Sequence, residues 1–214
     1  DTISSMKNSP FGLTQGGAKE RGMFAYWAKV TLAEILDGTS NTAMVAERVH
    51  GTTIAKMTPP VPVKSGHYAV TGAVIHTNPN FCRAQASGMY YNAGVTLGVC
   101  CNPPWGGNRW PDGSPAYASF TTVLPPNSPN CIDANHDAGN PIYIISSVSS
   151  FHPGGALVAM ADGSVRFVNE NIDTGKLSFT EVSSGPSPYG VWGAMGSKDG
   201  GEGTGNLAPG AGNL

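Results

Sequence analysis

The stretch SSFHPGGALVAMADGSVRFVNENID, residues 149–173, decides how the fold is interpreted. In it, Asp162 and Gly163 stand between two segments in which apolar residues alternate with others. An Asp-Gly pair in such a setting is a strong local signal for a β-hairpin, because a type I′ turn needs a positive φ at both central positions. We therefore expect two antiparallel strands joined by a two-residue loop.

The length of this loop determines which residues of the hairpin face each other. A two-residue loop places Met160 opposite Val165. It also places Val158 opposite Phe167, on the same face of the hairpin. Since all four side chains are apolar, we expect this face to lie on the core.

The one histidine of the stretch, His152, raises the question of catalysis. A strand advances about 3.3 Å per residue, so ten extended residues would hold His152 and Asp162 roughly 30 Å apart. They could not then share a metal ion or a proton, and we interpret Asp162 as a turn former. The same register puts His152 opposite Asp173. A triad of Ser150, His152 and Asp173 is therefore a weaker alternative, and the strained G-x-S-x-G elbow of many hydrolases is absent.

The composition favours a fold with short strands and many turns. Only 12% of the 214 residues are charged, whereas the chain contains 29 glycines and 17 prolines. The net charge of −2 gives no indication of a nucleic-acid partner. No apolar run approaches the roughly 18 residues of a membrane-spanning helix. We expect one α+β domain, rich in β-structure, over residues 1–214.

Local patterns predict several elements along the chain. Thr31 and Glu34 match a capping box, in which each end of the pair satisfies a backbone group of the other, so a short helix should begin there. The alternating segment 42–49 predicts a strand. Segment 67–77 is also strand-like, and the β-branched, uncharged segment 141–151 predicts a central strand.

The four cysteines lie in a segment rich in proline, asparagine and glycine, residues 78–141. Neighbouring residues have Cα atoms about 3.8 Å apart, whereas a disulfide needs about 5.5 Å, so Cys100 and Cys101 should not bridge each other. We expect them to pair with Cys82 and Cys131, in either order. Disulfides would staple this loop-rich insertion and indicate an oxidising, extracytoplasmic compartment. Four reduced, buried thiols are the alternative.

One loop has the beginning of a calcium-binding pattern. Asp133, Asn135 and Asp137 supply side-chain oxygens at alternate positions, as calcium loops do. The pattern is incomplete, because Ile144 stands where an EF-hand has its glutamate. A bound calcium ion and a polar turn built from these side chains are both open.

Other polar and aromatic side chains permit several interpretations. Glu47 and Arg48 are adjacent and read as a surface charge pair at a strand end, which stabilises little. The insertion also carries aromatic residues that could form a ligand-binding surface or a small local core, namely Tyr90, Tyr91, Trp105, Trp110 and Tyr117. The Gly-rich tail, residues 197–214, should be flexible unless the body of the protein or a neighbouring chain holds it.

His152, nine residues, and then the Asp-Gly pair resemble the H-x9-DG motif of the bacterial prepilin-type, pseudopilin-like secretion family. Three further segments are similar to blocks of the same family, in the same order. Residues 36–49 resemble its early helix-turn-strand block, residues 110–131 its central block and residues 188–202 its closing segment.

The resemblance implies a precursor with a basic leader, a prepilin-peptidase site and a long apolar N-terminal helix, which this chain lacks. What remains would be the extracytoplasmic globular head of a subunit similar to type II secretion pseudopilins and type IV pilins, a helix-poor α+β domain built on an antiparallel sheet. It implies a structural, non-enzymatic role that requires no cofactor. The partners would be like subunits in a filament or other envelope proteins, with the membrane reached only through the missing helix. A secreted carbohydrate- or protein-binding module is the alternative, and a hydrolase ranks last.

Overall fold

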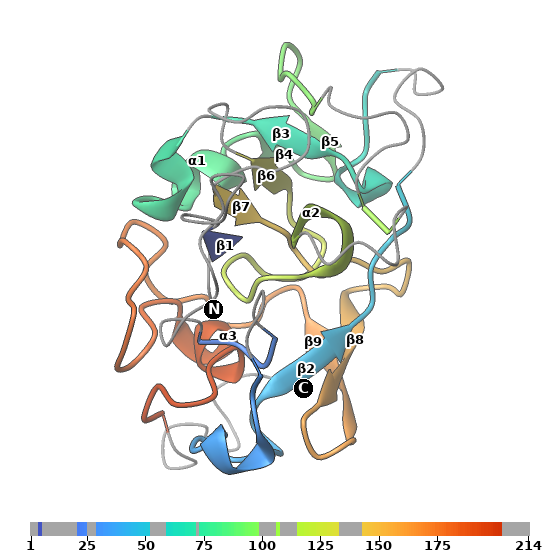
Figure 1. Ribbon diagram of the computed structural model, residues 1–214. Helices are drawn as coiled ribbons and strands as arrows, with labels where there is room; N and C mark the ends of the chain where they lie inside the picture. The colour runs from blue at the N-terminus through green and yellow to red at the C-terminus, as the bar shows by residue number, and fades with distance from the viewer. Residues whose placement is uncertain are drawn as a thin grey trace.

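The computed structural model describes residues 4–5, 21–24, 29–51, 59–71, 73–98, 106–107, 115–132 and 143–202. In these ranges the fold mixes α and β structure, is rich in strands and has only short helices (Figure 1). This confirms the β-rich class expected from the composition. None of the helices in the described ranges combines the length and apolar character that crossing a membrane requires.

The strands of the described ranges form three sheets. They are β1 (Ser4–Ser5), β2 (Ala43–Ala46), β3 (Tyr68–Val70), β4 (Ala86–Ser87), β5 (Tyr90–Tyr91), β6 (Asn130–Ile132), β7 (Tyr143–Ile145), β8 (Gly155–Met160) and β9 (Val165–Asn169). The helices are α1 (Asn80–Arg83), α2 (Pro115–Ala118) and α3 (Gly190–Met195), with 3₁₀ turns η1 (Leu32–Glu34), η3 (Val63–Ser65) and η4 (Ala73–His76). In Figure 1 the strands β3, β6 and β7 lie in the upper half, and β2, β8 and β9 lie in the lower half near α3.

The mixed sheet has the strand order β1-β7-β6-β3. β6 is antiparallel to β7 but parallel to β3. Parallel neighbours need a long crossover, because the chain must return to the same end of the sheet before the second strand begins. The loop-rich segment 78–141 supplies most of this crossover and contains β6 itself. β7 lies inside the sheet, as the sequence predicted for segment 141–151.

The hairpin predicted around Asp162 is present as β8 and β9, which pair antiparallel. Its loop, however, is longer than expected. The Gly163 N–H donates to Met160 O (2.9 Å) and the Met160 N–H donates to Ser164 O (2.8 Å), so three residues form the loop. Within that loop only Gly163 has a positive φ, of 86°. The prediction of a two-residue type I′ turn was therefore wrong.

A side-chain interaction explains the longer loop. Asp162 Oδ1 accepts hydrogen bonds from the Ser164 N–H (2.8 Å) and the Ser164 hydroxyl (2.6 Å). This Asx turn lets Asp162 keep a negative φ, and the left-handed conformation falls on Gly163 alone, which is the usual arrangement of three-residue hairpin loops. Asp162 is thus a turn former, though in a different turn.

The extra loop residue moves the strand register by one position and exchanges the faces of β9. Leu157 lies opposite Phe167, and Val158 lies opposite Arg166. Val158 is buried, as expected. Phe167 and Val165 are instead 39% and 61% exposed, so the prediction that they line the core was wrong.

Two larger apolar clusters hold the described structure together. One lies under the mixed sheet and includes Leu124, Ile145 and Tyr189. The other lies under β8 and is centred on Trp192 of α3, whose side chain is fully buried. The Trp192 indole Nε1 donates to Leu124 O (2.8 Å), a residue of the first cluster. This hydrogen bond links the two clusters.

The disulfide pairing differs from the expectation. Cys82 of α1 is bonded to Cys131 of β6, with Cα atoms 5.7 Å apart. The prediction that each of them would pair with Cys100 or Cys101 was wrong, because the parallel pairing of β6 brings Cys131 into the buried cluster that contains Cys82. Cys100 and Cys101 themselves lie outside the described residues.

The first part of the Gly-rich tail, residues 197–202, packs against the body of the protein. Ser197 is fully buried, and its hydroxyl accepts a hydrogen bond from the guanidinium of Arg21 (3.2 Å). The carboxylate of Asp37 accepts hydrogen bonds from the N–H of Gly200 (2.7 Å) and of Gly201. The tail therefore begins as a closing segment; its later residues lie outside the described ranges.

Gly155 at the start of β8 should not tolerate a side chain. A Cβ atom there would contact the carbonyl oxygen of Val168 and would lie 2.8 Å from the ring of Phe167. We expect Gly155→Ala to lower the free energy of unfolding by about 1–3 kcal/mol, measured by urea denaturation. Gly22→Ala is the matched control, because its Cβ would meet only an ordinary contact at 3.7 Å. Equal effects of the two substitutions would contradict this.

Candidate functional site

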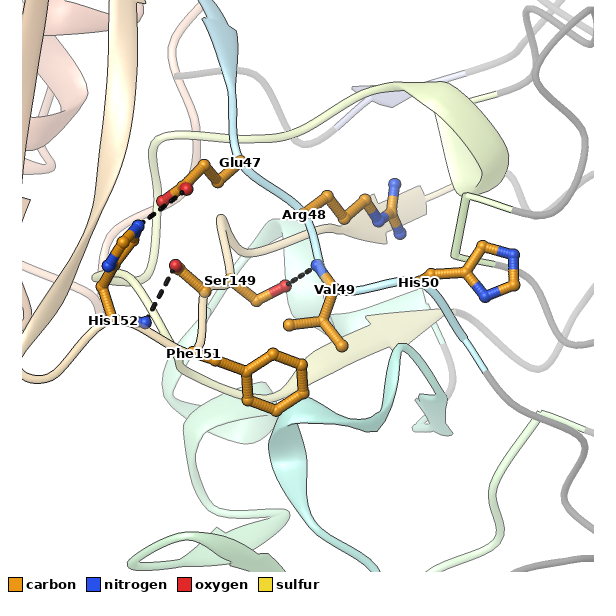
Figure 2. A pocket seen from close by; sticks show the side chains of 8 residues that line it. Glu47, Arg48, Val49, His50, Ser149, Phe151 and His152 are labelled. Atoms are coloured by element: carbon orange, nitrogen blue, oxygen red, sulfur yellow. Dashed lines mark hydrogen bonds and ion pairs between the residues drawn. The ribbon is translucent and has the colours of Figure 1, made fainter.

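The H-x9-DG stretch begins beside a shallow pocket at the base of the hairpin. The pocket lies where the chain leaves β2 and where the segment after β7 turns into β8 (Figure 2). It is lined by Glu47, Arg48, Val49, His50, Ser149, Ser150, Phe151 and His152. These residues come from two segments far apart in the sequence, so the pocket exists only in the folded chain.

The side chain of His152 contacts the carboxylate of Glu47 across this pocket, and the contact is an ion pair when the imidazole is protonated. The imidazole Nε2 lies 3.3 Å from Glu47 Oε1, and Figure 2 shows the two side chains pointing toward each other. The second carboxylate oxygen of Glu47 accepts a hydrogen bond from the Leu157 N–H (2.7 Å). The motif histidine and a strand of the hairpin are thereby attached to the same carboxylate at the end of β2.

The serines of the pocket bind backbone groups. The Ser149 hydroxyl accepts a hydrogen bond from the Val49 N–H (3.0 Å), and the Ser150 hydroxyl accepts one from the His152 N–H (3.1 Å). Among the residues that line the pocket, no hydrogen bond joins a serine hydroxyl to the imidazole of His152. A serine activated by a histidine base makes that contact, whereas here both hydroxyls accept from backbone N–H groups.

The electrostatics of the pocket favour an ionised Glu47. Partial burial alone would raise the pKa of this carboxyl. The hydrogen bonds from the Leu157 N–H and the Ser150 hydroxyl and the nearby imidazole of His152 outweigh burial, and the pKa of Glu47 is lowered below its ordinary value of 4.5. An ionised Glu47 is the form that holds both the imidazole and the hairpin.

Acid should therefore weaken this attachment. A carboxyl whose pKa is lower in the folded chain stabilises the fold above its unfolded pKa, and this contribution is lost as the pH falls through the folded value. We expect the melting temperature to drop between pH 5 and pH 3, and to drop less in Glu47→Gln. Scanning calorimetry across this range tests it. Parallel curves for the two proteins would show that Glu47 does not contribute.

Arg48 does not pair with Glu47, which corrects the sequence-based interpretation. Its guanidinium donates to Ser119 O (2.8 Å) and Ala116 O (3.2 Å), and it also contacts the hydroxyl of Tyr68. Figure 2 shows Arg48 turned away from Glu47. Successive residues of an extended chain point in opposite directions, which explains why the two neighbours separate.

The two aspartates of the motif region lie away from the imidazole. Asp162 is bonded to Ser164 at the far end of the hairpin, and hydrogen bonds from the Ser164 hydroxyl and N–H lower the pKa of its carboxyl. Asp173 accepts hydrogen bonds from the N–H of Gly175 (2.9 Å) and of Val191 (3.3 Å). The predicted pairing of His152 with Asp173 was wrong, because the ladder ends at Gly155 and Asn169. The alternative triad is not assembled.

Asn127 is a residue of this region that sequence reasoning missed. It has a φ of 63°, a left-handed conformation that asparagine tolerates better than most residues. Its side chain accepts a hydrogen bond from the Ser150 N–H (2.8 Å) and donates to Glu170 Oε1 (2.5 Å) and Gly155 O (3.4 Å). Asn127 thus binds the chain just before the hairpin at Ser150, the start of β8 at Gly155, and the residue after β9, Glu170. The only sequence signal was its place between prolines, which indicates a turn.

The predicted metal ligands Asp133, Asn135 and Asp137 lie outside the described residues, as do Trp105 and Trp110. In the described ranges, no group of three or more His, Cys, Asp or Glu side chains is placed to hold a metal ion. The calcium site therefore stays a prediction. Of the described loop aromatics, Tyr91 and Tyr117 are buried, whereas Tyr90 is 42% exposed.

Comparison with known proteins identifies one family. The profile of a family described as "Protein of unknown function (DUF1559)" matches residues 9–175, which is more than half of the chain and includes the motif. No curated protein matches the chain significantly. No solved structure matches it significantly either.

Proposed function

We propose that this chain, which belongs to the DUF1559 family of proteins of unknown function, is the extracytoplasmic head of a pilin- or pseudopilin-like subunit. Its role would be structural, in assembly, without catalysis. The observation that supports this most strongly is that the motif side chains hold parts of the fold together. His152 attaches the hairpin to Glu47, and Asp162 stabilises the turn, so both side chains are occupied in holding the fold.

The surroundings of the motif support the same role. Asn127 and the buried serines before β8 bind backbone groups of neighbouring segments. Such a network fixes the position of the hairpin relative to the mixed sheet. A rigid, strand-rich head with exposed side chains on one sheet is suited to contacts between subunits.

The Cys82–Cys131 disulfide supports the extracytoplasmic location. Disulfides persist in oxidising compartments and are rare where thiols are kept reduced. A head of this kind needs no cofactor for a structural role. A calcium ion bound by the loop around Asp133 would only stiffen that loop.

The test is the N-terminus of the protein from its native source. Mass spectrometry of the mature protein should find a methylated N-terminal phenylalanine followed by a long apolar sequence. Immunogold electron microscopy should place the protein on filaments or in the cell envelope. A mature protein without an apolar N-terminal segment, found free in the medium, would contradict the proposal.

A secreted binding module is the second candidate, favoured by exposed apolar side chains in the crossover segment. Phe81 is 48% exposed, Met89 68% and Tyr90 42%. Aromatic rings on a rigid support can stack on sugars or fill a partner's pocket. Retention on a glycan array that is lost in Trp105→Ala or Trp110→Ala would support this candidate. An array without any retained glycan would count against carbohydrate binding.

A further inference from the structure

β9 forms one edge of the β2-β8-β9 sheet. The residues that flank β9, Ser164 and Glu170, form backbone hydrogen bonds with β8 or with the residue before it. The Met160 N–H donates to Ser164 O (2.8 Å), and the Glu170 N–H donates to Gly154 O (2.8 Å). Bonded and non-bonded pairs alternate along an antiparallel ladder. The odd-numbered residues of β9 therefore turn their N–H and C=O groups away from β8, toward the open edge.

Val165 and Phe167 are outward-facing residues of this kind. In the part of the chain that the structure describes, no other segment donates to or accepts from their outward backbone groups. Their side chains are 61% and 39% exposed. Proteins commonly protect such an edge with charged side chains, lysine above all, or with proline. The strand VRFVN contains no lysine and no proline, and its one charged residue is Arg166. Within the described residues, nothing occupies this edge, and it can accept another extended strand.

We propose that β9 pairs antiparallel with β9 of a second copy of this chain, with Phe167 of each copy on the two-fold axis. The contact joins two three-stranded sheets into one continuous sheet. It names a partner surface for the proposed structural role, but it gives a closed dimer and needs no filament. A two-fold contact uses the same patch on both copies, so a single exposed strand is sufficient.

The sequence of β9 favours this register. Phe167 is the middle residue of the five-residue strand, so pairing it with its own counterpart overlaps the two strands along their full length. Arg166 then faces the partner's Val168 and not the partner's Arg166. A register centred on Arg166 would instead place two guanidinium groups directly opposite each other, which is destabilising.

The exposed face beside the edge would be covered in part by the same contact. Phe167 lies opposite Leu157, which is 36% exposed, and Val165 lies opposite Ala159. In the dimer the two Phe167 rings stand side by side between the Leu157 side chains of the two copies. Aromatic pairs across neighbouring strands stabilise a sheet. The row formed by Leu157, Phe167 and their two counterparts would cross the interface at its centre.

The test measures the mass of the purified chain by light scattering and by sedimentation over a wide range of concentration. The mass should rise from 22.1 kDa toward twice that value. Phe167→Lys and Phe167→Glu each place like charges on the axis, and each should raise the dissociation constant roughly tenfold or more. An equimolar mixture of the two variants should dimerise again, because lysine then faces glutamate.

Two further variants keep the test decisive. Val165→Pro removes an outward N–H while leaving Phe167 in place, and it should also weaken the dimer. Val45→Lys is the matched control, since Val45 is 52% exposed on β2, the opposite edge of the same sheet. It should leave the dimer unchanged. Circular dichroism confirms that each variant is folded.

A chain that stays monomeric at every concentration would overturn the proposal. So would a dimer that survives the Phe167 variants, or one that only Val45→Lys disrupts. These outcomes say nothing about the N-terminus of the native protein, so the proposed filament or envelope role would still be judged by its own test.

Discussion

Replacing both bridged cysteines, in Cys82→Ala/Cys131→Ala, should lower the free energy of unfolding by about 4 kcal/mol. The bridge closes a loop with a sequence separation of 49 residues, and it restricts the unfolded chain in proportion to the logarithm of that length. Both cysteine side chains are also fully buried in the apolar cluster under the mixed sheet, so the substitution removes core contacts. Urea denaturation followed by circular dichroism measures the change.

A matched comparison separates the bridge from the packing. Cys82→Ala/Cys131→Ala should melt at the same temperature with and without a reducing agent, whereas the unchanged chain should lose stability on reduction. If the double variant were as stable as the unchanged chain, the Cys82–Cys131 pairing would be wrong.

Trp192→Ala should lower the free energy of unfolding by about 3–5 kcal/mol. The side chain is fully buried at the centre of the cluster under β8, and the substitution leaves a large cavity there. It also leaves Leu124 O without the indole hydrogen bond of 2.8 Å that joins the two clusters. Thermal and urea unfolding both report the loss.

Trp192→Phe is the matched control for this prediction. Phenylalanine keeps much of the apolar volume but cannot donate to Leu124 O, so its effect should be clearly smaller than that of alanine. Equal losses for the two variants would mean that packing around Trp192 contributes little. A loss below about 1 kcal/mol for alanine would contradict the burial of this side chain.

Elements with local causes were predictable from the sequence. The capping box at the start of η1 is present, because the Thr31 N–H donates to Glu34 Oε2 (2.6 Å) and only one turn of chain separates the two residues. The hairpin at Asp162 is present for the same reason. A short pattern was sufficient in both cases, since the interacting groups are neighbours in the chain.

Two features were not predicted, one with a local cause and one with a distant cause. The register of the hairpin depends on one Asx hydrogen bond, between Asp162 and Ser164, that competes with a shorter turn. The disulfide depends on the parallel pairing of β6 with β3, because this pairing carries Cys131 into the cluster that holds Cys82. The spacing of the cysteines along the chain carries no information about their pairing, whereas the Asx hydrogen bond was one of two local turns that the same residues allow.

The candidate site could be predicted only in part. His152 stands out because it belongs to a motif, but its partner Glu47 directly follows β2, and the sequence suggests a pairing of Glu47 with its neighbour Arg48. Nothing in the local pattern around Glu47 indicates a histidine from the hairpin. Asn127 was missed for the same reason, because only the folded chain brings it to Ser150, 23 residues away.

The most direct test of the claim that the motif histidine serves the architecture is a double-mutant cycle. The free energies of unfolding of His152→Ala, Glu47→Ala and the double variant are compared with that of the unchanged chain by urea denaturation. We predict a coupling of about 0.5–1 kcal/mol between the two side chains, as for a partly exposed ion pair. Strictly additive effects, with no coupling between His152 and Glu47, would contradict the account.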